Sequence, residues 1–274
     1  MPMTKHAMQD NDLVRGLTGY LETLQLAGID AISRAVPSEL KPLPTPHPEP
    51  IREETMPKRP ENIIEQPVVE QPVKTDDSRL DLSSADRTAA LRQLADQVAQ
   101  CKKCPELAAQ RTQTVFGVGN PFSELVFLGE APGADEDKQG IPFVGRAGKL
   151  LTDMIEKGMK LRRDDVYICN ILRCRPPGNR NPLPDEAACC RPFLDATLQI
   201  IRPKYMCCLG SIAATNLLNT QETIGRLRGR VHEFQGIKVV CTYHPAYLLR
   251  NPSAKSAAWD DLKLLMREMG LPVP

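Results

Sequence analysis

This sequence of 274 residues has few histidines, no long apolar run and almost no net charge. No stretch of 18 or more apolar residues occurs, so no segment is predicted to span a membrane. The first twelve residues are polar and lack the apolar core of a secretory signal, which argues against export and favours a cytoplasmic location. Histidine occurs only four times, so a histidine inside a motif stands out.

The near-neutral charge hides an asymmetry along the chain. The formal net charge is +1, from 35 basic and 34 acidic side chains. Residues 1–80 hold 9 Lys and Arg against 13 Asp and Glu, whereas residues 81–274 hold 26 against 21. A modestly basic C-terminal part is compatible with a polyanionic partner such as a nucleic acid, but it does not establish one.

Composition divides the chain into three segments. Apolar residues recur at helical spacing from about 12 to 35, which predicts a short helix within residues 1–36. These apolar residues are too few for an independent core. The segment is therefore expected to dock on a protein partner, to pack on the edge of the main domain or to have no specific role. Residues 37–82 hold ten prolines between 37 and 75, a density that predicts an extended, disordered linker. Residues 83–274 are the predicted globular domain.

Strands and helices alternate in this third segment, and each predicted strand is a continuous apolar run. Such alternation is typical of a parallel sheet covered by helices on both faces. We predict an α/β fold, namely a three-layer α/β/α sandwich around a central, mainly parallel four-stranded sheet, preceded by the disordered linker and the short N-terminal helix. The predicted strands are 124–129, 166–171, 205–209 and 237–242, and the predicted helices are 85–100, 146–158, 185–201, 211–218 and 254–269.

A loop rich in glycine, proline and acidic residues follows the first predicted strand. It begins Gly129-Glu-Ala-Pro-Gly-Ala-Asp-Glu-Asp137 and contains four carboxylates within eight residues. The carboxyl end of a strand is where open α/β sheets place their ligand crevices. Carboxylates raise one another's pKa and are costly to bury. The cluster therefore indicates metal or acid–base chemistry, or, with equal weight, a solvated acidic turn.

Nine cysteines in a chain without a secretion signal indicate thiols and metal binding rather than a disulfide framework. Cys101 and Cys104 form a C-x-x-C pair, Cys174 lies in a polar loop, and Cys190 lies on the next predicted helix. Four thiolates suit tetrahedral zinc or a [4Fe–4S] cluster, and spacing alone does not separate the two. Cys189 is the rival fourth ligand; because neighbours on a helix point about 100° apart, only one of the two is expected to face the site. The other four lie within predicted strands and are expected to be buried.

Three predicted strands end in polar side chains. Glu130 follows the first strand, Asn170 closes the second and His244 follows the fourth. The carboxyl ends of parallel strands meet at one edge of a sheet, so we expect a carboxylate, an amide and an imidazole in one crevice. From the residues alone, this pattern indicates a metal-clamped α/β enzyme.

Five motifs in order resemble those of family 4 uracil-DNA glycosylases, the iron–sulfur members of the uracil-DNA glycosylase superfamily. They are GEAPGADED, the Phe143 that follows it, VYICNI, RCRPPGNRNPLPDE and HPAYLLRNP, and the resemblance covers about residues 85–269. It implies removal of uracil, the product of cytosine deamination, from DNA by cleavage of the N-glycosidic bond. It also implies a prokaryotic, nucleoid-associated repair enzyme that acts on uracil-containing DNA as a monomer.

The resemblance implies roles for individual residues. Because the target nucleotide must leave the duplex stack, Phe143 would stack on the flipped uracil. Asn170 would read the Watson–Crick edge of uracil, which cytosine presents in the opposite pattern. His244 would donate a hydrogen bond to O2 as negative charge builds on the departing base. Gly129 and Glu130 of the loop would contact uracil or the attacking water.

Water activation and DNA contacts follow from the same resemblance. Glu136 is a second candidate for orienting water or steadying the cationic sugar. Ala131 stands where the best-known uracil glycosylases place a catalytic aspartate, so the group that activates water is left open. Leu248 would enter the minor groove as a wedge that replaces the flipped base, and Arg250 would hold a phosphate.

The cofactor that the resemblance implies is a [4Fe–4S] cluster held by Cys101, Cys104, Cys174 and Cys190. About eighty residues precede the usual start of the family, which leaves open a protein partner through residues 1–36. Two rival classes are a nonenzymatic iron–sulfur DNA-binding or replication-associated protein and a zinc-bound α/β hydrolase acting on a small substrate. Activity on hypoxanthine or xanthine and the preference for single or double strands are also open.

Overall fold

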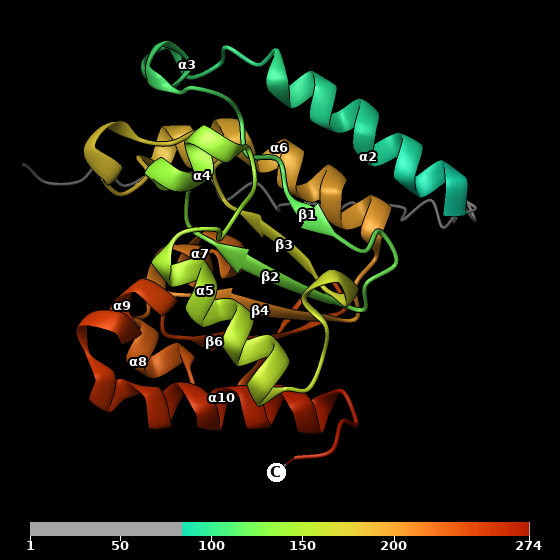
Figure 1. The fold of residues 1–274 in the computed structure, drawn as a ribbon, viewed down its shortest axis with the longest axis vertical. Coiled ribbons are helices and arrows are strands. Elements are labelled where there is room, and N and C mark those ends of the chain that lie inside the picture. The colour runs from blue at the N-terminus through green and yellow to red at the C-terminus, as the bar shows by residue number, and fades with distance from the viewer. Residues whose placement is uncertain (1–83, 274) are drawn as a thin grey trace, which may run out of the picture. The chain divides into compact units, whose positions relative to one another are not determined.

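The computed structural model describes residues 84–273, in which a six-stranded sheet lies between two layers of helices (Figure 1). The helix predicted within residues 1–36 and the linker predicted over residues 37–82 lie outside the described residues. A helix with the length and apolarity needed to cross a membrane does not occur in the part that the structure describes.

The four predicted strands form the parallel centre of the sheet. In chain order the strands are β1 (Val118–Gly119), β2 (Leu125–Gly129), β3 (Tyr167–Asn170), β4 (Tyr205–Leu209), β5 (Val231–Phe234) and β6 (Ile237–Thr242). The spatial order in the described residues is β1-β3-β2-β4-β6-β5, and β3, β2, β4 and β6 run parallel to one another. β1 and β5 add antiparallel edges that the sequence did not predict, because each is short and only partly buried.

Both faces of the central strands are buried, which explains their continuous apolar runs. Side chains alternate along a strand, so Val126 and Leu128 of β2 point to one face while Leu125 and Phe127 point to the other. All four are at most 1% exposed. The core therefore consists of two apolar layers, one on each side of the sheet. The strand cysteines are buried as predicted: Cys169, Cys207, Cys208 and Cys241.

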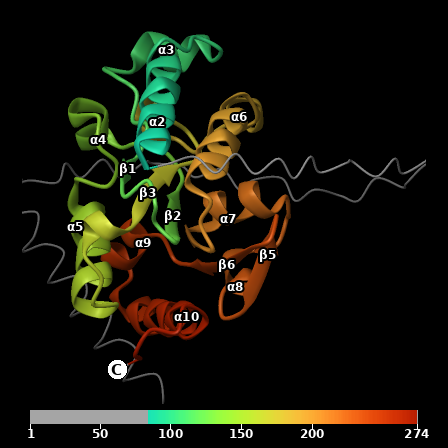
Figure 2. The same ribbon diagram turned by 90° about the vertical axis from the view of Figure 1, so that its right-hand side faces the viewer.

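Helices cover both faces of the sheet. They are α2 (Ser84–Ala99), α3 (Pro105–Gln110), α4 (Ala134–Gln139), α5 (Arg146–Asp153), α6 (Pro184–Ile201), α7 (Ser211–Leu218), α8 (Ile224–Leu227), α9 (Pro245–Arg250) and α10 (Lys255–Glu268). α2, α6 and α7 pack on one face, whereas α5 and α10 pack on the other (Figures 1 and 2). The predicted helices are confirmed, although α5 passes into a π-helical turn at Met154–Gly158. The short helices α3, α4, α8 and α9 have too few residues to show a period.

A buried ion pair fastens the end of β6, the strand that leads to His244. Asp261 on α10 is 0% exposed. Its oxygens accept hydrogen bonds from Arg228 Nε at 3.0 Å, from Gly229 N at 3.0 Å and from Thr242 Oγ1 at 2.8 Å. Removing one member of such a pair leaves the other charge without compensation, so this contact should matter for stability.

Asp261→Ala is expected to lower the free energy of unfolding by about 3–5 kcal/mol, because it leaves the Arg228 guanidinium unpaired beside buried groups. Urea unfolding measures the change. Asp260→Ala is the matched control: this neighbouring carboxylate is exposed and pairs with Lys263, so the expected loss is under about 1 kcal/mol. Similar losses in the two variants would contradict the account of α10.

Candidate active site

A pocket with an empty volume of about 1060 Å³ opens at the carboxyl ends of the parallel strands. In Figure 1 the arrowheads of β2 and β3 point toward the side on which α4 and α9 lie. Ile171 N donates to Gly129 O at 2.9 Å, which holds the ends of β3 and β2 together. The pocket brings together six residues of the predicted site and leaves out Gly129 and Leu248; the six are Glu130, Glu136, Phe143, Asn170, His244 and Arg250.

Phe143 is held in a left-handed backbone conformation, with φ of 55°, which is strained for a bulky residue. A Cβ at Gly148 would lie 1.9 Å from the Phe143 carbonyl oxygen, so the turn requires glycine at that position. Arg163 Nη2 donates to the carbonyl oxygens of Pro142 and Phe143 at 2.9 and 3.1 Å. These contacts fix the turn that presents the Phe143 ring to the pocket, where its centroid lies 5.7 Å from that of His244.

Asn170 has a buried side-chain oxygen without a hydrogen-bond partner. The residue is 2% exposed, and Oδ1 has no donor among the described residues. Gly129 makes room for this side chain, because a Cβ there would lie 2.3 Å from Asn170 Oδ1 and 2.6 Å from Phe143 Cζ. A buried acceptor left open is unfavourable for folding. Asn170 Oδ1 is therefore a strong candidate for a ligand-binding atom, with Gly129 shaping the wall behind it.

His244 is neutral at pH 7. Burial lowers its pKa from 6.5 to about 4; the positive charge of Arg250 adds to this shift and Glu136 opposes it. His244 Nδ1 accepts a hydrogen bond from Ala246 N at 3.1 Å, so the proton of the neutral ring lies on Nε2. The imidazole therefore brings an N–H donor to the pocket rather than a positive charge.

The lowered pKa of His244 makes stability depend on pH. The unfolded histidine binds a proton near pH 6.5, whereas the folded one binds a proton only near pH 4. The burial of the neutral imidazole therefore contributes fully to the stability of the folded state above about pH 6.5, and this contribution is lost as the pH falls toward 4. We expect the free energy of unfolding to fall more between about pH 7.5 and about pH 5 in the parent protein than in His244→Gln, whose side chain does not titrate. Urea titrations at the two pH values measure it, and equal falls would contradict the pKa assignment.

The carboxylates of Glu136 and Glu130 differ in how many hydrogen bonds their oxygens already accept. Glu136 Oε1 accepts from Val144 N at 2.9 Å and Gly145 N at 3.0 Å, and Oε2 accepts from Gly133 N at 3.1 Å. Glu136 thus ties the loop after β2 to the loop before α5. In the described part of the chain, no hydrogen bond or ion pair occupies the Glu130 carboxylate, and burial raises its pKa.

The acidic loop does not gather its carboxylates around one point. Residues 134–139 form α4, on which Asp135 is exposed. Asp137 is buried and accepts from Thr112 N at 3.0 Å with both oxygens. Among the described residues, no group of three His, Cys, Asp or Glu side chains is arranged to hold one metal ion. The loop therefore lines the pocket with Glu130 and Glu136, whereas Asp137 binds the backbone of Thr112.

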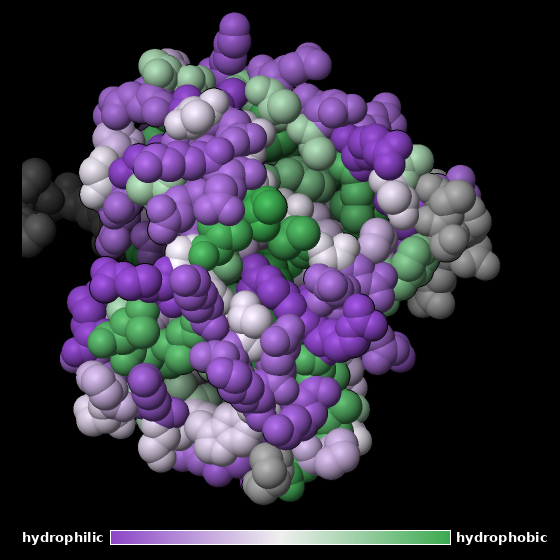
Figure 3. Space-filling view, in the orientation of Figure 1, coloured by the Kyte–Doolittle hydropathy of each residue, from purple (hydrophilic) through white to green (hydrophobic). Residues whose placement is uncertain are grey.

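α9 buries the leucine that was predicted to enter the minor groove and exposes its neighbours. Leu248 is 2% exposed and Pro245 is buried too, because residues three apart share one helix face. The side chain that was predicted to be the wedge is therefore buried in this structure. Tyr247 and Leu249 are 39% and 42% exposed, and Figure 3 shows an apolar patch over α9. Arg250 is exposed and lines the pocket.

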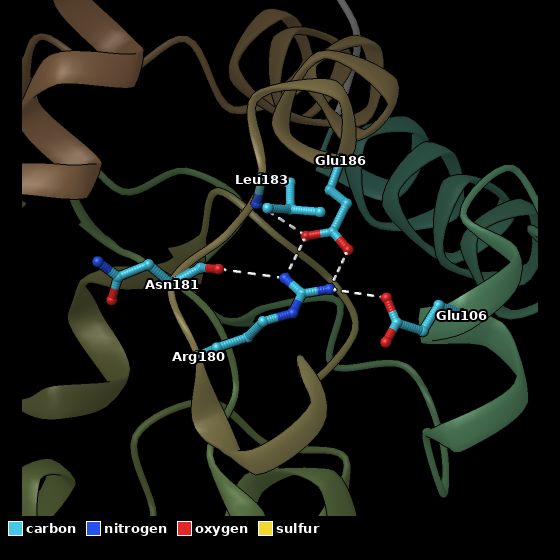
Figure 4. Close-up of polar contacts among 5 residues, drawn as sticks. All are labelled: Glu106, Arg180, Asn181, Leu183 and Glu186. Atoms are coloured by element: carbon cyan, nitrogen blue, oxygen red, sulfur yellow. Dashed lines mark hydrogen bonds and ion pairs between the residues drawn. The ribbon is translucent and has the colours of Figure 1, made fainter.

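The loop between β3 and α6 lines the pocket with residues that the sequence did not single out, among them Arg180. Arg180 holds the loop through a forked contact: Nη1 and Nη2 donate to Glu186 at 2.9 and 2.7 Å, and Nη2 also donates to Glu106 at 3.0 Å (Figure 4). Leu183 N donates to Glu186 at 2.8 Å. Arg180 therefore connects the pocket loop to α6 and to α3, which begins directly after Cys104.

Five cysteines line a second cavity, with an empty volume of about 360 Å³: Cys101, Cys104, Cys174, Cys189 and Cys190. Burial raises the pKa of the Cys104 thiol to about 12, and the neighbouring cysteines add to the shift. Arg111 Nη1 donates to Cys174 Sγ at 3.0 Å. The structure thus brings the four predicted ligand cysteines together with two arginines, Arg111 and Arg173, around one cavity.

Cys189 and Cys190 both line this cavity, so the expectation that only one of them faces the site is wrong. Cys189 and Cys190 both raise the pKa of the Cys104 thiol, so both lie near Cys104 at this cavity.

Fold and pocket together define an α/β protein whose ligand crevice lies at the carboxyl ends of a parallel sheet. A family model described as the uracil DNA glycosylase superfamily matches residues 116–263. That range contains every residue of the pocket described above.

Curated relatives narrow the assignment. A type-4 uracil-DNA glycosylase of Archaeoglobus fulgidus is 44% identical over 182 residues, which cover 64% of this chain and 90% of the relative. Type-4 uracil-DNA glycosylases of Thermotoga maritima and Sulfurisphaera tokodaii are 46% and 41% identical, covering 58% and 66% of this chain and 83% and 86% of their own lengths. The chain therefore belongs to the uracil-DNA glycosylase superfamily and, within it, to the type-4 group, as its motifs predicted.

Proposed function

We propose that this protein is a DNA repair hydrolase that removes uracil from DNA by cleaving the N-glycosidic bond, with the flipped base held between Phe143, Asn170 and His244. The observation that carries the proposal is the buried Asn170 Oδ1, which is an acceptor without a hydrogen-bond partner in a residue that is 2% exposed and lines the pocket. The names of the type-4 relatives support the same activity.

Asn170 suits the recognition of uracil. Its open Oδ1 would accept from uracil N3–H, and its Nδ2 would donate to O4. Cytosine presents an acceptor at N3 and a donor at N4, so it would leave the buried amide unpaired. Sites built to hydrogen-bond one pattern reject the other strongly for this reason. The Phe143 ring, fixed by its strained turn, supplies the apolar surface on which the flipped base would stack.

His244 suits the stabilisation of the departing base. When the C1′–N1 bond breaks, its electron pair stays on uracil, and negative charge spreads to O2. The neutral imidazole with its proton on Nε2 would donate to that oxygen without first losing or gaining a proton. A preoriented donor in a partly buried site is more effective than water for this purpose.

Glu130 is our assignment for water activation. Water must form the new bond to C1′ while losing a proton, and a carboxylate with a raised pKa accepts that proton more readily. Glu130 has this property and an unoccupied carboxylate. The oxygens of Glu136 already accept three backbone N–H groups, which supports a positioning role for Glu136.

DNA contacts are assigned to α9. Arg250 is an exposed cation at the pocket, in keeping with a phosphate contact. Leu249 and Tyr247, rather than Leu248, carry the exposed apolar surface that a wedge between bases requires.

Release of free uracil tests the proposed activity. The purified full-length chain would be incubated with DNA that contains radiolabelled uracil, and the soluble fraction would be analysed for the free base. We expect labelled uracil as the product, with an abasic site left in the strand. Labelled nucleotide instead of free base, or no product, would refute the proposal.

A [4Fe–4S] cluster is our proposal for the cysteine cavity. A cluster held by four thiolates is an anion overall. Arg111 Nη1 donates to Cys174 Sγ and Arg173 lines the same cavity, which supports an anionic occupant. The cysteines are not arranged to share one metal ion, whereas each corner of a cluster takes its own thiolate. Cys101, Cys104, Cys174 and Cys190 would hold the cluster, which would tie α2, the loop after β3 and α6 together.

Iron content and colour test the cofactor. Protein purified without oxygen is expected to be brown, with about four iron atoms and four sulfides per chain. Cys104→Ser should lose both, whereas Cys207→Ala, a change of a buried strand cysteine, should keep them. A colourless protein that contains zinc would refute the cluster and favour a zinc site.

A further inference from the structure

Arg173 is a buried arginine at the junction between the pocket and the cysteine cavity. It is 1% exposed, and none of the ion pairs among the described residues includes it. Arg173 Nη2 donates to Thr197 Oγ1 at 3.2 Å, and Nε has no partner. A buried cation without a counter-charge is strongly unfavourable, so a negative partner is expected nearby.

The cysteine cavity offers that partner. Arg173 lines the cavity together with Cys174 and Cys190. Thiols that bind a metal cluster are deprotonated. Occupation of the site would therefore place negative charge in the cavity that Arg173 lines.

The Arg173 guanidinium also contacts the strand end that carries Asn170. Arg173 Nη1 donates to the backbone carbonyl of Asn170 at 3.0 Å, and the guanidinium lies 5.4 Å from the centre of the Phe116 ring. Asn170 is the last residue of β3, and beyond it Ile171 N and Leu172 N still donate to Gly129 O and Glu130 O. The guanidinium adds a side-chain contact to this strand end through the Asn170 carbonyl, so it would help to set the position of the amide that reads the base.

We propose that Arg173 is a positioning residue that couples the cysteine cavity to base recognition: the charge of the occupied cavity holds the guanidinium, and the guanidinium holds the Asn170 end of β3. The inference rests on the proposed function of the pocket and on the proposed cluster. It adds a specificity role to a residue that touches neither the base nor the reacting atoms.

Binding to an uncleavable substrate tests the coupling. Full-length Arg173→Met and Arg173→Lys proteins, with their clusters, would be titrated with DNA carrying one 2′-fluorinated deoxyuridine or one thymidine, and fluorescence anisotropy would give both affinities. We expect the preference for uracil to fall about tenfold in Arg173→Met, or about 1.4 kcal/mol, and by less in Arg173→Lys, which keeps the charge. The cluster's reduction potential should fall in Arg173→Met, because a neighbouring positive charge is lost.

Arg87→Met is the matched control. Arg87 is a partly buried arginine that also donates to a backbone carbonyl, Ile201 O, at 3.1 Å and lies over the Phe122 ring. Its loss should reduce stability but leave the uracil preference and the potential unchanged. Should Arg173→Met fail to fold, Thr197→Val removes one acceptor of the guanidinium and should show a smaller fall in preference.

Parent-like preference and potential in a folded Arg173→Met protein would overturn the inference. So would a fall in preference of the same size in Arg87→Met. A parent protein that releases no uracil would refute the proposed function instead, which separates the two failures.

Discussion

Asn170→Asp is expected to abolish most of the discrimination between uracil and cytosine. The carboxylate keeps an acceptor for uracil N3–H but replaces the amide donor to O4 with a second acceptor. It also offers an acceptor to the N4 amino group of cytosine. Because a site built on matched hydrogen bonds discriminates by about 10⁴-fold or more, we expect the ratio of excision rates on uracil and cytosine to fall by at least about 100-fold.

Single-turnover excision on matched uracil and cytosine oligonucleotides measures this ratio. Asn216→Asp is the control, because Asn216 lies on α7 outside the pocket and donates to Ile212 O within its own helix. An unchanged ratio in Asn170→Asp would show that the open Oδ1 is not the atom that reads the base.

His244→Ala is expected to slow excision by about 10²–10³-fold while leaving DNA affinity within about threefold of the parent. The missing Nε2–H donor acts on charge that develops only as the bond breaks, so the loss should fall on the rate rather than on binding. Single-turnover rates with saturating protein and anisotropy titrations on the same oligonucleotide separate the two quantities.

His232→Ala is the matched control for this change. His232 is the other histidine among the described residues, and its Nε2 contacts Leu227 O at 2.6 Å, away from the pocket. If both variants lost activity equally, the effect of His244→Ala would be one of stability and not of chemistry. A loss of DNA binding that matched the loss of rate would contradict the role assigned to the imidazole.

The sheet and its main helices could be predicted because their signals are local. Apolar runs bounded by turn residues marked β2, β3, β4 and β6, and parallel strands bring their carboxyl ends to one edge. That rule is enough to place Glu130, Asn170 and His244 in one pocket. The edge strands β1 and β5 were not predicted, because a strand of two to four partly exposed residues carries no such signal.

Other features depend on contacts between distant segments. The left-handed turn at Phe143 requires Gly148 and Arg163. The burial of Leu248 is decided by which face of a six-residue helix meets the body, and a period cannot be read from so short a helix. The buried position of Arg173 follows from long-range packing alone, because its flanking sequence looks like a polar, exposed loop.

Excision on defined oligonucleotides tests the central claim most directly. The purified protein would be incubated with labelled strands that carry one uracil, one cytosine or one thymine at the same position, and alkali would then convert each abasic site into a strand break. We expect breakage at uracil and none at cytosine or thymine. An intact uracil strand that the folded protein still binds would contradict the proposed activity and favour a nonenzymatic DNA-binding role.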